Sequence, residues 1–275
     1  MEPLVPTKWL ADRLGEPDLV VVDASWHMPA TGRSGGDEFL TAHIPAARFL
    51  DIDALSDGAN PAPHMMPSGQ AFGSAMAKLG VARDHRIVVY DNSSLRTAAR
   101  GWFMLRHFGA RQVAILDGGM QKWLAEARPV ERGEPGFRNG KFEADERSGE
   151  VVAKSAVLGS GVILDARGEA RFTGGEPDPR PGVAPGHIPG SRNLPFVALY
   201  REDGTFKSID EIRAAFAAAG VDPAIPFTAT CGSGVTANSL IFAAHLLGND
   251  AVRLYDGSWG EWGADPATPK ALGPA

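Results

Sequence analysis

The stretch that decides the fold runs Phe227-Thr-Ala-Thr-Cys231-Gly-Ser-Gly-Val-Thr236-Ala-Asn-Ser-Leu-Ile-Phe242. Its first four residues predict a short strand, a glycine-containing loop follows Cys231, and an apolar helix comes next. A thiol between the carboxyl end of a strand and a helix N-terminus meets converging N–H groups and a positive dipole end, which favour a thiolate. The two glycines let the backbone wrap closely around the sulfur. We therefore expect Cys231 to be a nucleophile; the alternative is a small buried hydrophobic residue.

The composition predicts a soluble globular protein. The 275 residues are 44% apolar and 22% charged, enough chain for one large domain or two of ordinary size. A net charge of −6 without any basic run argues against a nucleic-acid surface. Cys231 is the only cysteine, which excludes an intrachain disulfide and a cysteine-based zinc site. Because neither an export signal nor a membrane-spanning run is visible, we expect a cytoplasmic protein that binds no nucleic acid and no membrane.

The second half of the chain repeats the order of the first. Four landmarks recur: Val20-Val-Val-Asp23 as Val162-Ile-Leu-Asp165, Ala42-His-Ile-Pro as Gly186-His-Ile-Pro, a helix at 69–80 as one at 209–219, and Ile115-Leu-Asp117-Gly as Leu254-Tyr-Asp256-Gly. This duplication, with a period too long for a solenoid, predicts two domains. We place them at residues 1–130 and 151–275, joined by a linker at 131–150 that is rich in Gly, Arg and Glu.

Each copy alternates strands with helices, which predicts an α/β fold with a mainly parallel sheet flanked by helices. We expect strands at 19–23, 86–90, 113–117, 161–165 and 227–230, and helices at 8–14 (capped by Thr7), 69–80, 96–108, 120–127 and 209–219 (capped by Ser208). Ligands of such sheets bind at the carboxyl ends of the strands, where Cys231 lies.

The two copies differ at this loop. The first copy has Asp91-Asn-Ser-Ser-Leu-Arg-Thr-Ala98 after its matching strand, without a cysteine or glycines. We therefore expect one nucleophile, in the second domain, with the first domain supplying a wall of a cleft between them. His43 and His187 occur in both copies, which favours a structural role for them.

The chain resembles the tandem-domain sulfurtransferases. The resemblance covers nearly the whole chain and rests on the duplication, the paired His-Ile-Pro segments, Asp256-Gly-Ser-Trp-Gly-Glu-Trp262 and the loop Cys231-Gly-Ser-Gly-Val-Thr236. It implies two rhodanese-like domains and persulfide chemistry on Cys231 without a metal or an organic cofactor. The members that take sulfur from 3-mercaptopyruvate are the most similar. Those that use thiosulfate carry basic side chains where Gly232 and Ser233 stand here, and thiosulfate:cyanide transfer is the alternative.

The resemblance further implies a proton relay of Asp53, His64 and Ser233. Taken alone, these residues would be a turn residue, a surface histidine between prolines and a loop serine. Asp51 competes with Asp53 for the first place in the relay. The relay would move a proton from the donor thiol to the departing carbon.

Two arginines match those that hold the donor's carboxylate and carbonyl in this family. They are Arg171 and Arg180 of Glu169-Ala-Arg-Phe-Thr-Gly-Gly-Glu-Pro-Asp-Pro-Arg180, which alone would be solvated charges in a loop. The planar fork of a guanidinium suits a carboxylate, because it donates two parallel hydrogen bonds. We expect the backbone N–H groups of the loop to hold the persulfide anion; they belong to Gly232, Ser233, Gly234, Val235 and Thr236.

Two other classes of function compete with sulfur transfer. A cysteine-dependent phosphatase needs an arginine to close the loop after five intervening residues, where this chain has Ala237. A module that only docks partners would not need the intact cysteine loop. We therefore expect an enzyme whose donor is small and whose sulfur acceptor is a thiol, such as a thioredoxin-like protein.

Overall fold

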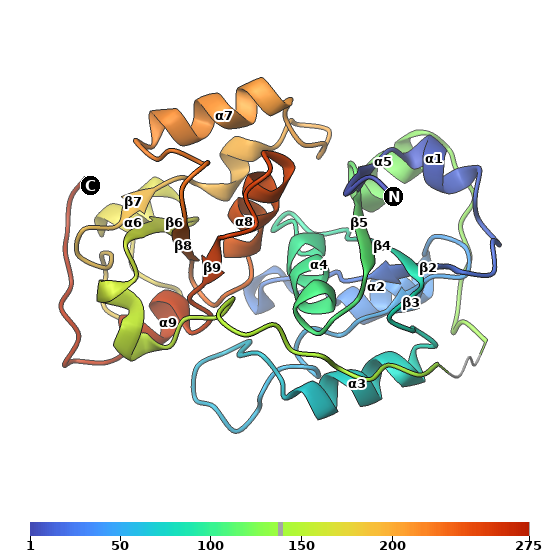
Figure 1. Ribbon diagram of the computed structural model, residues 1–275, viewed down its shortest axis with the longest axis horizontal. Helices are drawn as coiled ribbons and strands as arrows, with labels where there is room; N and C mark the ends of the chain where they lie inside the picture. Colours follow the sequence, from blue (N-terminus) through green and yellow to red (C-terminus); the bar gives the residue numbers. More distant parts are fainter. Residues whose placement is uncertain (137–139, 275) are drawn as a thin grey trace. The chain divides into compact units, whose positions relative to one another are not determined.

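The computed structural model describes residues 1–136 and 140–274. These residues divide into two compact units (Figure 1). Unit 1 comprises residues 1–56, 66–147 and 202–206, and unit 2 comprises residues 57–65, 148–201 and the chain from Lys207 onward. Each unit therefore includes a short segment from the other half of the sequence.

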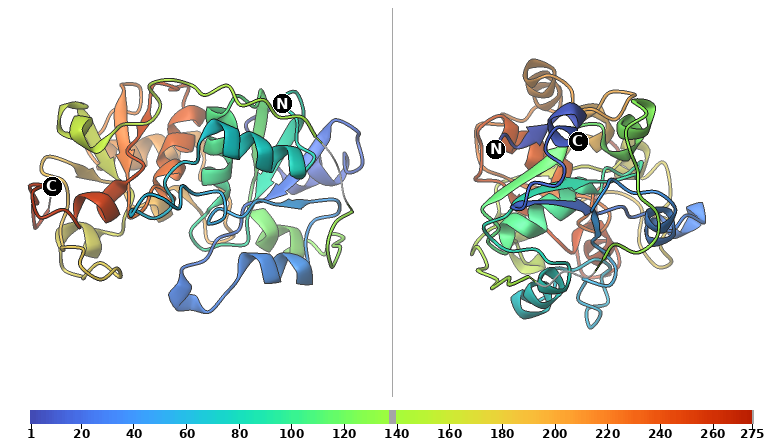
Figure 2. Two further views of the ribbon diagram at one scale, coloured as in Figure 1. Left: turned by 90° about the horizontal axis from the view of Figure 1, so that it is seen from below. Right: turned by 90° about the vertical axis from the view of Figure 1, so that its right-hand side faces the viewer.

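Unit 1 contains a five-stranded sheet in the order β1-β5-β4-β2-β3, in which every neighbouring pair is parallel. Its strands are β1 (Leu4–Val5), β2 (Leu19–Asp23), β3 (Arg48–Phe49), β4 (Arg86–Tyr90) and β5 (Gln112–Leu116). Its helices are α1 (Thr7–Ala11), η1 (Pro29–Thr31), α2 (Gly35–Thr41), α3 (Gly69–Lys78), α4 (Ala98–His107) and α5 (Gly119–Ala125). Helix α4 packs on β4 and β5 (Figure 2).

Unit 2 repeats this plan with a four-stranded parallel sheet in the order β7-β6-β8-β9. Its strands are β6 (Val162–Asp165), β7 (Arg192–Asn193), β8 (Phe227–Thr230) and β9 (Arg253–Leu254). Its helices are η2 (Lys154–Gly159), α6 (Glu169–Thr173), η3 (Phe196–Leu199), α7 (Ile209–Ala218), α8 (Ala237–Leu246) and α9 (Ser258–Trp262). Helix α8 packs on β8, β9 and η3.

The strand registers confirm the duplication. Asp23, the last residue of β2, pairs with Tyr90 of β4, and Asp165, the last residue of β6, pairs with Thr230 of β8. The residues that follow Tyr90 and Thr230 are Asp91 and Cys231, so these two occupy equivalent positions. The predicted α/β fold with two mainly parallel, helix-flanked sheets is confirmed.

The paired histidines have the same surroundings in both units. The Nδ1 atom of His43 bonds to the carbonyl oxygen of Phe39 at 2.7 Å, and that of His187 bonds to the carbonyl oxygen of Phe172 at 2.9 Å. Each imidazole also stacks on the ring of the same phenylalanine. Both histidines are buried, so the structural role expected for them is confirmed.

One predicted helix differs in its extent and in its cap. Helix α1 begins at Thr7 and ends at Ala11, whereas a helix over 8–14 capped by Thr7 was expected. Pro6 takes the N-cap position, and the Thr7 hydroxyl instead donates to the carboxylate of Glu126. This long-range contact satisfies the hydroxyl that the sequence pattern assigns to a local cap. Ser208 does cap α7, and it forms a full capping box with Glu211.

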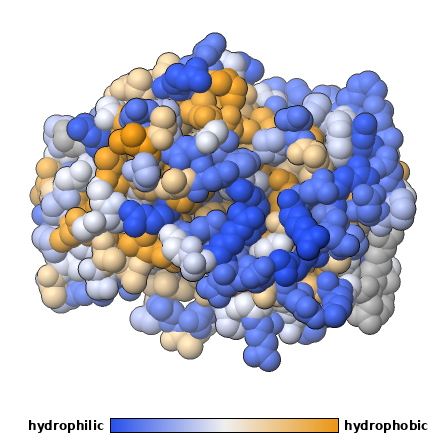
Figure 3. All heavy atoms as spheres, viewed as in Figure 1, coloured by the Kyte–Doolittle hydropathy of each residue, from blue (hydrophilic) through white to orange (hydrophobic). Residues whose placement is uncertain are grey.

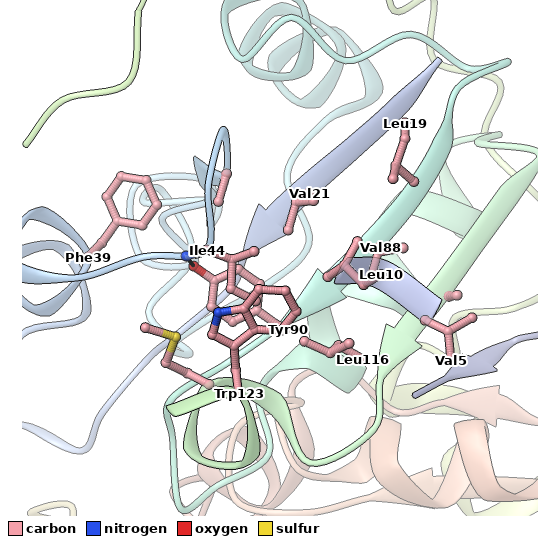
Figure 4. Close-up of a cluster of buried hydrophobic side chains, with 13 residues drawn as sticks. Val5, Leu10, Leu19, Val21, Phe39, Ile44, Val88, Tyr90, Leu116 and Trp123 are labelled. Carbon is pink, nitrogen blue, oxygen red and sulfur yellow. Dashed lines mark hydrogen bonds between the residues drawn. The ribbon is translucent and has the colours of Figure 1, made fainter. Parts of the chain in front are cut away.

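The core of unit 1 forms where alternate strand residues meet the loops after β2 and β5. Tyr90, Val88 and Leu116 point toward Trp123, and all four side chains are buried (Figure 4). The Tyr90 hydroxyl accepts a hydrogen bond from the backbone N–H of Ile44 at 3.3 Å. Burial of each large side chain contributes about 2–3 kcal/mol, which fixes the strand ends that carry Asp91.

The surface mixes polar and apolar residues. On the face in Figure 3, hydrophobic and hydrophilic residues are interspersed. The large hydrophobic side chains that are exposed come from separate elements, such as Leu124 of α5, Leu158 of η2 and Val197 of η3. Within the described part of the chain, no helix is both long and apolar enough to span a bilayer.

Candidate active site

Cys231 lies in unit 2 at the carboxyl end of the central strand β8. The loop of residues 231–236 leads directly into α8, so its backbone supplies the N–H groups that precede the first helical turn. The side chain is 1% exposed. The expected arrangement of strand, cysteine loop and apolar helix is confirmed, and burial by itself fits both a nucleophile and a small core residue.

Ser258, the first residue of α9, contacts the cysteine loop from the neighbouring strand end. Its Oγ accepts the backbone N–H of Cys231 at 3.1 Å and that of Gly234 at 3.0 Å. The same hydroxyl lies 3.9 Å from Cys231 Sγ and 2.9 Å from the carbonyl oxygen of Tyr255, to either of which it can donate its one proton. Ser258 thus holds the loop at both ends of its first turn.

The backbone of the loop is braced on both sides. The N–H of Trp259 donates to the carbonyl of Cys231 at 3.0 Å, and the N–H of Gly260 donates to that of Gly232 at 2.9 Å. Gly234 has a left-handed backbone with φ +71°, and a methyl group there would lie 2.6 Å from the carbonyl oxygen of Asp256. Only glycine meets both conditions, so this glycine is required by the path of the loop.

His64 and Ser233 lie together in unit 2. The His64 Nδ1 atom is 2.9 Å from the Ser233 hydroxyl oxygen, although the two residues are 169 positions apart in the chain. His64 has a left-handed backbone with φ +61°, an uncommon conformation for a non-glycine residue. The loop that carries it is closed by the N–H of Asp57, which donates to the carbonyl of Met65 at 2.9 Å. Two of the three predicted relay residues are therefore in hydrogen-bond contact.

The third predicted relay residue, Asp53, belongs to unit 1. Both of its carboxylate oxygens lie 2.9 Å from the indole Nε1 of Trp26, which donates to them. Its competitor, Asp51, instead accepts the backbone N–H of Ala54 at 3.1 Å and so closes a turn. Asp53 has the side chain that is fixed by another side chain, which favours it over Asp51 as the relay carboxylate.

The two predicted arginines converge on the cysteine loop. A methyl group in place of the Gly232 hydrogen would lie 3.2 Å from Arg180 Nη2 and 3.3 Å from Arg171 Nη2. The guanidinium groups are about one quarter exposed, at 26% for Arg171 and 24% for Arg180. They therefore present cationic donors at the residue next to Cys231, and a side chain at position 232 would occupy that space.

Three residues that contact predicted site residues were not themselves predicted. Asp178 bridges the two arginines, Ser258 holds the cysteine loop and Trp26 holds Asp53. A signal existed for Ser258, because alignment of the repeats places it where the first copy has Gly119. Asp178 stands two residues before Arg180 in a proline-flanked stretch, but nothing local reveals that it also contacts Arg171. Trp26 carries no motif at all.

The equivalent loop in unit 1 is closed by its own carboxylate. Asp91 accepts the backbone N–H of Ser93 in the loop and that of Ala98, the first residue of α4, each at 2.8 Å. Burial raises the pKa of Asp91. Glu38 precedes Phe39 as Arg171 precedes Phe172, so a carboxylate paired with Arg33 stands in unit 1 where unit 2 has an arginine. The loop after β4 therefore has no thiol, and the position equivalent to Arg171 holds a carboxylate.

A model of the rhodanese-like domain matches residues 6–126 and again residues 150–265. The chain belongs to the rhodanese-like sulfurtransferases. This rhodanese-like chain is 41% identical over 271 residues to the 3-mercaptopyruvate sulfurtransferase of Escherichia coli K12, with 96% of each chain covered. It is also 41% identical over 271 residues to the thiosulfate sulfurtransferase of Bos taurus, covering 94% of this chain and 91% of the bovine one.

The fold agrees with these relatives. The crystal structure of SseA from Escherichia coli, described with the rhodanese fold and catalytic mechanism of 3-mercaptopyruvate sulfotransferases, superposes with a TM-score of 0.86. The match is 39% identical in sequence and covers 94% of this chain and 99% of that one. The resemblance inferred from the sequence is therefore confirmed at the level of family, fold and enzyme class.

Proposed function

We propose that this sulfurtransferase takes the sulfur of 3-mercaptopyruvate onto Cys231 as a persulfide and passes it to a thiol or to cyanide. The observation that carries the proposal is the approach of Arg171 and Arg180 to Gly232, next to the thiol. Two guanidinium groups at this point suit a small α-keto acid, because they can hold its carboxylate and carbonyl while its sulfur faces Cys231.

The proposed sulfur transfer conserves atoms, electrons and charge. The Cys231 thiolate attacks the donor sulfur, the bond between sulfur and C3 breaks, and its electron pair stays on the carbon as the enolate of pyruvate. The proton of the donor thiol is transferred to C3, which gives pyruvate and leaves an anionic persulfide on Cys231. The N–H groups of Gly232, Ser233, Val235 and Thr236, together with the N-terminal end of α8, would stabilise that anion. The expected contribution of Gly234 is corrected, because its N–H already donates to Ser258 Oγ. An acceptor thiolate then attacks the outer sulfur.

Ser233 and His64 would carry the proton. Their 2.9 Å contact gives the serine hydroxyl a base on one side and the donor on the other. Asp53, fixed by Trp26, is the third member of the proposed relay. No step requires a metal or an organic cofactor.

Thiosulfate is the second candidate donor, since a bovine thiosulfate sulfurtransferase is as similar in sequence as the bacterial 3-mercaptopyruvate enzyme. Gly232 and Ser233 argue against thiosulfate as the preferred donor, because both residues next to the thiol are neutral. The proposal keeps a thioredoxin-like protein as the thiol acceptor and the cytoplasm as the compartment. It also keeps the division into a domain at 1–130 without the catalytic cysteine, a linker at 131–150 and a catalytic domain at 151–275.

Two measurements test the proposal. With cyanide as acceptor, the ratio kcat/KM should be higher for 3-mercaptopyruvate than for thiosulfate, and the reverse order would reject the donor assignment. Treatment with 3-mercaptopyruvate should add one sulfur atom to the intact protein and release pyruvate, and Cys231→Ser should abolish both. Release of phosphate from an aryl phosphate would instead revive the phosphatase alternative.

A further inference from the structure

Asp178 joins the two arginines of the proposed donor clamp. One carboxylate oxygen, Oδ2, accepts from Arg171 Nη2 at 2.6 Å, and the other, Oδ1, accepts from Arg180 Nη1 at 3.0 Å. Oδ1 also accepts the backbone N–H of Arg180 at 3.0 Å, which closes a tight turn. The side chain of Asp178 is 1% exposed, whereas each arginine is about one quarter exposed. The carboxylate is thus inside and the cationic donors are outside.

This geometry leaves donors for a substrate. A guanidinium has five N–H donors, and Asp178 uses one side-chain nitrogen of each arginine. The Nε of Arg171 is buried and, among the described residues, has no hydrogen-bond partner. The nitrogens that face Gly232 are the Nη atoms of both arginines, and these keep N–H donors for a carboxylate.

The net charge of Arg171, Arg180 and Asp178 bears on which donor the site favours. Two arginines and one aspartate sum to one positive charge. The α-keto acid 3-mercaptopyruvate carries one carboxylate, whereas thiosulfate is a dianion. Without Asp178 the same two guanidinium groups would present two positive charges next to Cys231, which would favour a dianion.

We propose that Asp178 is the selectivity and positioning residue of the donor clamp: by bridging Arg171 and Arg180 it sets the net charge beside Cys231 to one, and so favours a monoanionic α-keto acid over a dianionic sulfur donor. This inference rests on the proposed function, because it assumes that the arginines receive the donor. Asp178 touches the arginines and acts on the donor through them.

The test compares Asp178→Asn, which removes the charge and keeps the shape, with Asp178→Glu, which keeps the charge. For each protein, kcat/KM is measured with 3-mercaptopyruvate and with thiosulfate, using cyanide as acceptor. We expect the asparagine variant to shift the ratio of the two kcat/KM values toward thiosulfate by about ten- to a hundredfold, through KM more than kcat. The glutamate variant should retain most of the wild-type ratio.

If Asp178→Asn lowers kcat/KM equally for both donors, Asp178 only supports the loop and the inference is overturned. An equal shift of the donor ratio in Asp178→Asn and Asp178→Glu would overturn it as well. The change of ratio on substitution is independent of the wild-type preference, so a failure of the proposed donor is distinguished from a failure here. If the asparagine variant does not fold, inhibition of the wild-type enzyme by small anions tests the inference instead. Pyruvate should inhibit at least tenfold more tightly than sulfate, a dianion, and the opposite order would refute the role of Asp178.

Discussion

Ser258 and Gly119 occupy the same position in the two repeats and share a left-handed backbone, with φ of +53° and +55°. The next residue does the same in both units: the N–H of Trp259 donates to the carbonyl of Cys231, and the N–H of Met120 donates to the carbonyl of Asp91. Glycine adopts this conformation without steric cost, whereas another residue loses about 1 kcal/mol or more. Only the repeat with the thiol has serine here, and its hydroxyl bonds to the cysteine loop.

Ser258→Gly and Ser258→Ala should therefore separate backbone strain from the hydroxyl. Both variants remove the acceptor of two buried N–H groups, and we expect persulfide formation from 3-mercaptopyruvate to slow by about ten- to a hundredfold in each. The glycine variant relieves the strain and should be more stable than the alanine variant by about 1 kcal/mol. Single-turnover kinetics and thermal unfolding measure the two effects. Wild-type rates in Ser258→Gly would exclude a role for the hydroxyl.

The contact between His64 and Ser233 predicts a donor-dependent defect. Ser233→Ala should lower kcat with 3-mercaptopyruvate by about 10²- to 10⁴-fold, because the carbon that leaves the sulfur must be protonated. Thiosulfate leaves sulfite and needs no proton on carbon, so its turnover should change little. Steady-state rates with both donors check this.

Ser68→Ala is a matched control for Ser233→Ala, since Ser68 caps α3 by accepting the N–H of Ala71 and lies outside the site. It should cost about 1 kcal/mol of stability and leave both activities unchanged. An equal loss on both donors in Ser233→Ala would mean that the serine supports the loop rather than moving a proton.

The sequence contains the information for the cysteine loop because that information is local. Strand, glycines and helix follow one another, and the two repeats align around them, so the place of Cys231 could be read from one stretch. The register that gives Asp91 in unit 1 the position that Cys231 has in unit 2 follows from the same alignment. The sequence did not predict which side chains from distant segments contact the site residues.

Asp178 and Trp26 illustrate that limit. Asp178 is seven residues from Arg171, and only the turn closed by the N–H of Arg180 brings the carboxylate between both guanidinium groups. Trp26 meets Asp53 across 27 positions that include α2 and β3. Neither contact follows from a periodic pattern or a fixed spacing in the sequence, since each depends on how a loop folds over a sheet edge. Thr7 is the converse case, in which a distant carboxylate overrides a local cap.

Asp23 predicts a dependence of stability on pH. It lies at the end of β2, where desolvation by burial raises its pKa to about 7. The folded state therefore binds this proton more tightly than the unfolded chain, whose value is near 3.8. The stabilisation is complete below about pH 4 and is lost as the pH rises toward about 7, with a change of at most about 4 kcal/mol.

Asp23→Asn removes this titration while keeping an oxygen that can accept the N–H of Ser25. Relative to the wild type, the variant should gain stability as the pH rises from about 4 to 8. Urea unfolding at several pH values measures the difference, which cancels the titration of all other groups. Asp12→Asn serves as a control on an exposed carboxylate of unit 1. Parallel pH profiles for wild type and Asp23→Asn would show that Asp23 is ionised in the fold throughout.

Trp26 connects the loop that lacks the cysteine to Asp53, the proposed relay carboxylate. Thr97 accepts the backbone N–H of Trp26 at 3.2 Å, and the Ser93 hydroxyl donates to the carbonyl of Trp26 at 2.5 Å. These two residues of the unit 1 loop thus hold the backbone of Trp26, whose indole N–H donates to Asp53. Removal of the indole nitrogen takes a hydrogen-bond donor from the Asp53 carboxylate. We therefore expect Asp53 to lose its fixed orientation in the proposed relay.

Trp26→Phe should therefore lower kcat with 3-mercaptopyruvate by about three- to thirtyfold and leave thiosulfate turnover unchanged, since one hydrogen bond to a charged group contributes about 1.5–3 kcal/mol at most. Trp9→Phe is the matched control, because Trp9 lies on α1 with the guanidinium of Arg13 4.5 Å from its ring centroid, and it should keep both activities. Equal losses on both donors in Trp26→Phe would place the tryptophan in the packing of unit 1. A selective loss would mean that Trp26 acts on proton transfer through its hydrogen bond to Asp53.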